Sequence, residues 1–253
     1  MSFAGLGGLL AGVHDFSLVW PPIPKAVVWH GVLATIYGAT LLGGGIALLA
    51  PRMARSSALV LTAILLLRLL WLEAPHVAAH PLIEGVWEDF SENLAFVAGG
   101  WTIFSMLPRA RGALANFGSV RVGQLLFALA LPAFGLSHMF YMNMTAPLIP
   151  AWLPFHVPLA WFTGVAHIAA GAGIFFGVLP RLAATLEAVM VSLFTLLVWP
   201  PMLVAMPASR ANWSEICVSA AISAAAWAVA ESFREAPWTR RSRSASGRNS
   251  LAW

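Results

Sequence analysis

The chain has 253 residues, of which 60% are hydrophobic and only 9% are charged, and its formal net charge is +4. A soluble domain carries about 25% charged residues, so this composition excludes an ordinary water-soluble protein and indicates that lipid is the solvent. The basic residues lie mostly between apolar runs, where they report membrane topology rather than nucleic-acid binding. A single cysteine, Cys217, excludes an internal disulfide and a cysteine-based cluster.

Long apolar runs follow one another along the chain with short polar connections. Only helices satisfy their own backbone groups inside lipid, so each run predicts a spanning helix. The runs are 2–19, which is short and glycine-rich, 26–50, 56–73, 90–107, 122–144, 157–179, 182–203 and 213–231. The sequence thus predicts an all-α integral membrane protein with about eight transmembrane helices.

Arginines gather at alternate connections between these runs. The positive-inside rule places such connections in the cytoplasm. We therefore expect a multi-pass protein of a bacterial plasma (inner) membrane with both termini cytoplasmic. The arginines in question are Arg52, Arg55, Arg109, Arg111, Arg121 and Arg181, followed by those of the tail 234–253.

The two halves of the chain resemble each other. Pro75, Pro81, Trp87 and Asp89 recur 126 positions later, as Pro201, Pro207, Trp213 and Glu215. Pro51-Arg52 resembles Pro180-Arg181, the stretch 29–38 resembles 161–171, and 12–14 resembles 135–138. These matches predict two pseudo-repeated four-helix bundles, 1–110 and 111–233, the first with an abbreviated first helix. Residues 234–253 form a basic tail that we expect to be disordered and cytoplasmic.

The second half carries a series of small-residue and proline motifs. In chain order they are Gly135-Leu-Ser-His138, the stretch 148–154 with its Pro-Ala-Trp-Leu-Pro, the stretch 161–171, Leu179-Pro-Arg181 and Trp199-Pro-Pro201. This order resembles the DoxX-like family of small four-helix membrane proteins. The resemblance implies a membrane bundle, and named members are associated with the membrane part of a thiosulfate:quinone oxidoreductase. It supplies no catalytic set to carry over, and the first half departs from the pattern.

Polar side chains inside a membrane bundle are costly and therefore indicate function. Arg68 has Glu92 or Glu73 as its expected partner, either as a structural ion pair or as a contact to an anion or quinone headgroup. Asp89 and Glu215 precede the last helix of each unit, where they cap the helix or face a site. The candidates for a proton or quinone site are His14, Asp15, Arg68, Asp89, Glu92, His138, His167 and Glu215.

Histidines supply three further hypotheses. His14 and His138 each end the first helix of a unit and can relay protons or stay at the interface. His30 and His167 lie within helices, but they are not equivalent in the repeat, so haem is not expected. His76, His80 and Glu84 have a helical spacing that suits a metal, although Pro75 and Pro81 favour a loop there. Glu187 lies in the first turns of its run, near the inner face, where we expect it to snorkel or to pair with Arg181.

Three functions remain open from the sequence. The first is a membrane subunit of a redox or respiratory-type complex that interacts with quinone and works beside other protein subunits. The second is a non-catalytic subunit that anchors or assembles a larger complex. The third is a small-molecule permease whose two halves rock against each other.

Overall fold

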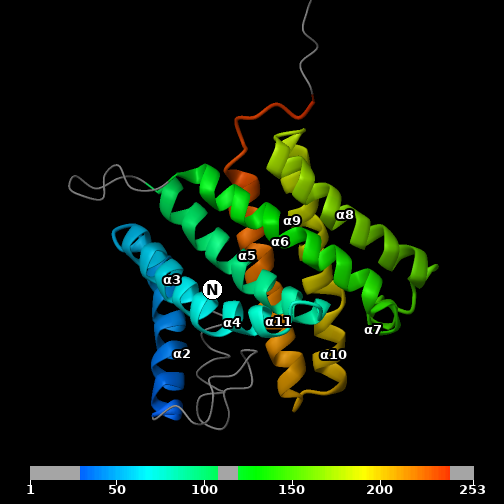
Figure 1. Ribbon diagram of the computed structural model, residues 1–253, viewed down its shortest axis with the longest axis horizontal. Helices are drawn as coiled ribbons and strands as arrows, with labels where there is room; N and C mark the ends of the chain where they lie inside the picture. The colour runs from blue at the N-terminus through cyan, green and yellow to red at the C-terminus, as the bar shows by residue number, and fades with distance from the viewer. Residues whose placement is uncertain (1–28, 108–118, 240–253) are drawn as a thin grey trace, which may run out of the picture.

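The computed structural model describes residues 29–107 and 119–239, and within these ranges every regular element is a helix (Figure 1). The predicted first helix 2–19, with His14 and Asp15, lies outside them, as do Arg109, Arg111 and most of the tail. The elements are α2 (His30–Ala47), α3 (Ala54–Arg68), η1 (Leu69–Glu73), α4 (Ala74–Ala79), α5 (Glu84–Met106), α6 (Val120–Phe140), α7 (Met142–Thr145), η2 (Ala146–Leu148), α8 (His156–Phe176), α9 (Pro180–Leu197), α10 (Trp199–Ala205) and α11 (Arg210–Glu231).

Each predicted span from 26–50 onward coincides with a helix. Five of the described helical segments are long and apolar enough to cross a membrane: Ala54–Ala79, Val120–Phe140, His156–Phe176, Pro180–Ala205 and Arg210–Glu231. α2 contributes a shorter apolar stretch, Thr35–Ala47. α5 is long enough but carries four acidic residues in its first half. The fold class is that of an all-α membrane protein, and the total of eight spans stays a prediction.

Apolar side chains cover the outside of the bundle, while small residues fill its interior. Phe176 and Val204 are 74% and 83% exposed, and only 11% of the most apolar window of Pro180–Ala205 is buried within the protein. Inside, a Cβ added to Gly99 of α5 would lie 2.5 Å from the Cβ of Ala225 in α11. An apolar exterior with small residues at helix contacts is typical of packing in lipid.

α5 and α6 form the centre of the bundle and pack against each other (Figure 1). α3 and α11 also pack on α5, α8 packs on α6, and α9 contacts both α8 and α11. α2 packs against α3 at the edge. Successive long helices therefore run in alternating directions, and the N-terminal half of α5 comes near the C-terminal half of α6.

The two halves place their helices in the same register. α2 and α8, α3 and α9, and α5 and α11 each begin 126 positions apart. Trp29 and Phe155, just before α2 and α8, both have a left-handed backbone conformation. The indole N–H of Trp87 donates to the carbonyl oxygen of Pro81 at 3.0 Å, and that of Trp213 donates to Pro207 at the same distance.

This register corrects two of the sequence matches. Arg55, rather than Arg52, stands opposite Arg181, and 29–38 stands opposite 155–164 rather than 161–171. Arg55 donates to the carbonyl oxygen of Phe104 and lies over its ring, at the end of α5. Arg181 donates to the carbonyl oxygen of Ala236 and lies over the ring of Trp238, beyond the end of α11. The earlier matches followed isolated Pro and Trp residues, which do not fix where a helix begins.

Candidate functional site

A cavity of about 1290 Å³ lies among α6, α8, α9 and α11, with the first half of α5 at one side. Most of its wall is apolar, including Phe134, Phe194 and Ile222. Six glutamate and histidine side chains interrupt this wall, and none of the described residues that line it is Lys or Arg. They are Glu88, Glu92, His138, His167, Glu187 and Glu215.

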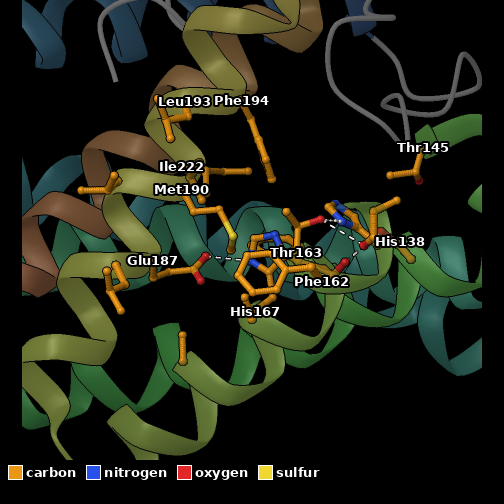
Figure 2. A pocket seen from close by; sticks show the side chains of 18 of the residues that line it. His138, Thr145, Phe162, Thr163, His167, Glu187, Met190, Leu193, Phe194 and Ile222 are labelled. Atoms are coloured by element: carbon orange, nitrogen blue, oxygen red, sulfur yellow. Dashed lines mark hydrogen bonds and ion pairs between the residues drawn. The ribbon is translucent and has the colours of Figure 1, made fainter. Parts of the chain in front are cut away.

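His167 and Glu187 form a buried pair on the wall of this cavity (Figure 2). Nδ1 of His167 lies 2.8 Å from Oε1 of Glu187, and the two residues are 2% and 1% exposed. The second carboxylate oxygen, Oε2, is buried and has no hydrogen-bond partner among the described residues. A buried carboxylate oxygen that the protein leaves unsatisfied is expensive, which points to a water molecule or ligand at that position.

The tight connection between α8 and α9 brings this pair together. Gly177 and Leu179 both adopt positive φ there, which reverses the chain within a few residues. Gly173 allows close packing, because a Cβ at that position would lie 2.8 Å from the Cβ of Ala183. The expected role of Glu187 is therefore wrong, because it is buried and pairs with His167, while Arg181 contacts Ala236 and Trp238. The apolar sequence around Glu187 gave no sign of a partner on the preceding helix.

His138, near the end of α6, lies beside His167 on the wall of the cavity. Its Nδ1 is hydrogen-bonded to Oγ1 of Thr163 at 2.9 Å. The Thr163 hydroxyl already donates to the carbonyl oxygen of Ala160, so Nδ1 of His138 is the donor to it. The ring centroids of His138 and His167 are 5.2 Å apart with an edge-on orientation. The side chain of Phe194 lies within about 6 Å of both rings, at 5.8 and 6.0 Å.

The acidic residues come from α5 and α11. Glu88 accepts a hydrogen bond of 2.9 Å from the Ser137 hydroxyl of α6. Glu92 and Glu215 line the same cavity. Asp89 is half-buried and is not among the residues that line the cavity. Its backbone carbonyl oxygen accepts a hydrogen bond from the Asn93 side chain. Of the two acids equivalent in the sequence repeat, only Glu215 thus reaches the cavity.

Arg68 belongs to a separate polar cluster in the first half. Its guanidinium lies 2.8 Å from Oε1 of Glu73 and donates to Oδ1 of Asn93, whose amide in turn donates to Glu73. All three residues are buried. The chain widens into the π-helical turn η1 here, where the Ala74 N–H bonds to Leu69, because Pro75 has no N–H to continue an α-helix. Of the two expected partners Glu73 is the one found, and Arg68 does not line the cavity.

The two clusters occupy non-equivalent positions in the two halves. Leu41 and Leu61 stand 126 positions before His167 and Glu187, and both are buried. Conversely, Phe194 stands 126 positions after Arg68. Each half thus carries a polar cluster where the other half is apolar. The cavity chemistry accordingly belongs to the second half and the N-terminal part of α5.

The proposed metal ligands do not form a site in the described residues. His76 and His80 make an edge-on ring contact with centroids 5.2 Å apart. No group of three or more His, Cys, Asp or Glu side chains within 29–107 and 119–239 could hold a metal ion. The expected loop is instead helix α4, because Pro75 occupies the first turn, where a missing N–H costs little. The side chain of His30 lies outside the described part, so the haem hypothesis stays untested.

Two residues of the cavity were missed as site candidates. Glu187 is the one acidic residue within its apolar run, a position that already indicates function. Glu88 lies midway between Glu84 and Glu92, so the three share one helix face. Both signals are present in the sequence.

Together these features define a helical membrane protein with an ionisable cavity among its spanning helices. No protein-family model matches the chain, and neither a curated protein nor a solved structure matches it. The likeness to the DoxX-like family therefore stays a prediction.

Proposed function

We propose that this chain is a membrane subunit that binds a lipid-soluble quinone in the cavity, beside a partner redox protein that supplies or removes the electrons. The cavity is large enough for a ring and part of an isoprenoid chain, since drug-sized ligands occupy about 300–1,000 Å³. Its apolar wall suits the ring and the chain. Its ionisable groups suit the carbonyl oxygens, which take up protons when a quinone is reduced.

Two histidines supply the polar contacts in this proposal. Nδ1 of His167 is engaged with Glu187 and Nδ1 of His138 with Thr163, which leaves Nε2 of each ring for a ligand. A neutral imidazole accepts a hydrogen bond from a hydroxyl at Nε2, whereas a protonated one donates to a carbonyl oxygen. The hydrogen bond to Glu187 fixes the orientation of the His167 ring, so its Nε2 is the atom left for a ligand. Imidazole and carboxyl groups both exchange protons, so the pair can pass a proton at the wall of the cavity.

The single observation that carries this proposal is the His167–Glu187 pair with its unsatisfied oxygen on the wall of a mostly apolar cavity. Oε2 of Glu73 in the Arg68 cluster is also buried without a partner, so the position of the His167–Glu187 pair on the wall of the cavity, and not the unsatisfied oxygen alone, carries the proposal. The anchor hypothesis offers no reason for the cavity or for the unpaired oxygen.

Quinone binding can be measured through tryptophan fluorescence, because Trp199 lines the cavity and quinones quench indole emission. The purified chain in detergent is titrated with a short-chain benzoquinone and a short-chain naphthoquinone. We expect saturable quenching, and the variant Glu187→Gln should bind about tenfold more weakly, as expected for the loss of a charge-assisted contact. The control Glu231→Gln changes an exposed acid and should bind like the parent chain. Absence of saturable binding in the parent chain would contradict the proposal.

One observation favours a second function, the exchange of a lipophilic cation for protons by a permease. Four carboxyl groups line the cavity and no Lys or Arg of the described ranges does, which suits a cation, and His167 lies midway along α8. Ionisable groups at this depth mark substrate and proton pathways. Binding of tetraphenylphosphonium with release of protons, and no binding of either quinone, would favour this function over the first.

A further inference from the structure

Three glutamates form a row along α5. Glu84, Glu88 and Glu92 recur every four residues, so their side chains share one face of the helix with about 5–6 Å between successive Cβ atoms. Glu84 is the first residue of α5 and follows Leu82 and Ile83, which are 97% and 50% exposed. Glu88 and Glu92 line the cavity. The row therefore spans about 12 Å from an exposed end of the bundle to the cavity.

No salt bridge within the described residues reaches any of these three carboxyl groups. Both oxygens of Glu84 are buried and have no hydrogen-bond partner in the described part of the chain. Glu88 accepts one hydrogen bond, from the neutral Ser137 hydroxyl. Arg68, the nearest basic group on the side of α3, is engaged with Glu73 and Asn93. Arg68 and Glu73 can order the bundle through their ion pair. The three glutamates of the row have no such partner in the described part of the chain, so this role does not account for them.

The row ends at a cavity that holds a proton acceptor. Glu187 is 1% exposed and keeps one oxygen without a partner, and His167 is bonded to its other oxygen. Several titratable groups face the row from the helices packed against α5. They are His138 and Tyr141 from α6 and its end, His167 from α8 and Glu215 from α11, while Asp89 lies on α5 itself with the Arg68–Glu73 pair on its side of the helix.

We propose that Glu84, Glu88 and Glu92 form a proton path that joins the water at this end of the bundle to the His167–Glu187 pair in the cavity. Each transfer breaks one O–H bond and forms another between a carboxyl group and the next carboxyl group or a bridging water molecule, and no electron moves. The use of the path rests on the proposed function, since quinone chemistry needs protons. The path itself is argued from the row, from its missing partners among the described residues and from the cavity that Glu88 and Glu92 share with Glu187.

The experiment follows the proton without any ligand. A light flash releases protons from a caged acid in a suspension of the purified full-length chain in nanodiscs. Time-resolved infrared spectroscopy then records the carboxyl band of Glu187, assigned by its loss in Glu187→Gln. We expect the band to rise at least about tenfold more slowly in Glu84→Gln and in Glu88→Gln, with the same final amplitude, as for loss of a proton-transfer group. Glu84→Asp should keep most of the rate, and Glu231→Gln is the control.

Thermal unfolding of each variant establishes that a slow rate does not come from misfolding. Glutamine keeps a carbonyl oxygen that can accept the Ser137 bond, so Glu88→Gln preserves that contact. Unchanged rates in both Gln variants would overturn the path, even if quinone binds the parent chain. A rate that depends on sodium concentration rather than on pH would overturn it too, because the row would then conduct a metal cation. Failure of quinone to bind, with slowed protonation in the variants, would overturn the proposed function and leave the path supported.

Discussion

His167 and Glu187 hold each other in place at a depth where neither side chain reaches water. Breaking a buried pair by removing one partner costs about 3–5 kcal/mol, whereas replacing both by apolar residues is often neutral. The first half supplies the apolar replacement, because Leu41 and Leu61 occupy the positions 126 residues earlier and are both buried. Replacing both His167 and Glu187 by leucine should therefore be tolerated, because the first half already packs leucines at the corresponding positions.

Glu187→Leu should lower the free energy of unfolding by about 3 kcal/mol, because it leaves His167 without its partner. The double variant His167→Leu with Glu187→Leu should recover most of this loss and still fail to bind a quinone. Unfolding in detergent followed by circular dichroism gives the stability, and fluorescence quenching gives the binding. A double variant as unstable as the sum of the two single variants would mean that the two side chains have no coupling energy, which would contradict a buried pair.

The sequence predicted the kind of residue at the site better than the contacts it makes. Arg68 was expected to pair with Glu92 or Glu73, and Glu73 is the partner. His138, His167, Glu92 and Glu215 were selected as ionisable groups in apolar runs, and the structure brings all four to one cavity. The partner of Glu187 was predicted wrongly because the contact depends on how α8 and α9 pack, which a single apolar run does not reveal.

Glycines set the distance between helices α6 and α8, and hence the position of His138. A Cβ at Gly135 would collide with the backbone oxygen of Gly164 and lie 2.6 Å from Ile168. A Cβ at Gly164 would lie 2.8 Å from the backbone oxygen of Gly135. The two backbones therefore touch, which lets His138 reach Thr163.

Gly135→Ala should force these helices apart and destabilise the protein by about 1–3 kcal/mol. The same change should weaken ligand binding, because it moves His138 away from Thr163. Gly43→Ala is the matched control, since a Cβ there meets nothing within 4 Å and should stabilise α2 slightly. Thermal unfolding and ligand titration of both variants test the contact. Equal stability of the two variants would mean that the contact between α6 and α8 tolerates a side chain at position 135.

Element boundaries were predictable where an apolar run is long, and not where proline interrupts it. The runs from 26–50 to 213–231 all contain helices. The stretch 75–81 was expected to be a loop, but it contains α4, preceded by a π-helical turn. Proline predicts a break in hydrogen bonding, and the helix adapts to that break by widening rather than ending.

On the scale of the whole molecule, the direction of the chain through the membrane stays a prediction. Arg55 and Arg121 lie at one end of the bundle, where they donate to carbonyl oxygens at the ends of α5 and α8. These hydrogen bonds satisfy carbonyl oxygens that the last turn of a helix leaves without a partner. They also agree with an arginine-rich cytoplasmic end. The chain of alternating helices places Leu82 at the opposite end.

Cysteine labelling of intact cells tests this orientation. In a Cys217→Ser background, Met53→Cys should resist a membrane-impermeant maleimide until the cells are opened, whereas Leu82→Cys should react from outside. Both positions are exposed, at 55% and 97%, so access depends on the side of the membrane. Labelling of both positions from the same side would contradict the topology.

The register of 126 residues between the halves extends beyond the four sequence matches that suggested it, since three pairs of helices begin at that spacing. Duplication as its origin stays a prediction. The cavity, by contrast, could not be predicted, because it depends on how five helices from both halves pack.

The most direct test of the account is photolabelling of the full-length chain in membranes with an azido-quinone, followed by mass mapping of the labelled peptides. We expect the label on α8 and α9 near His167 and Glu187, competed by unmodified quinone and much reduced in Glu187→Gln. Label spread evenly over lipid-facing positions such as Phe176 and Val204, without competition, would contradict a ligand site in the cavity.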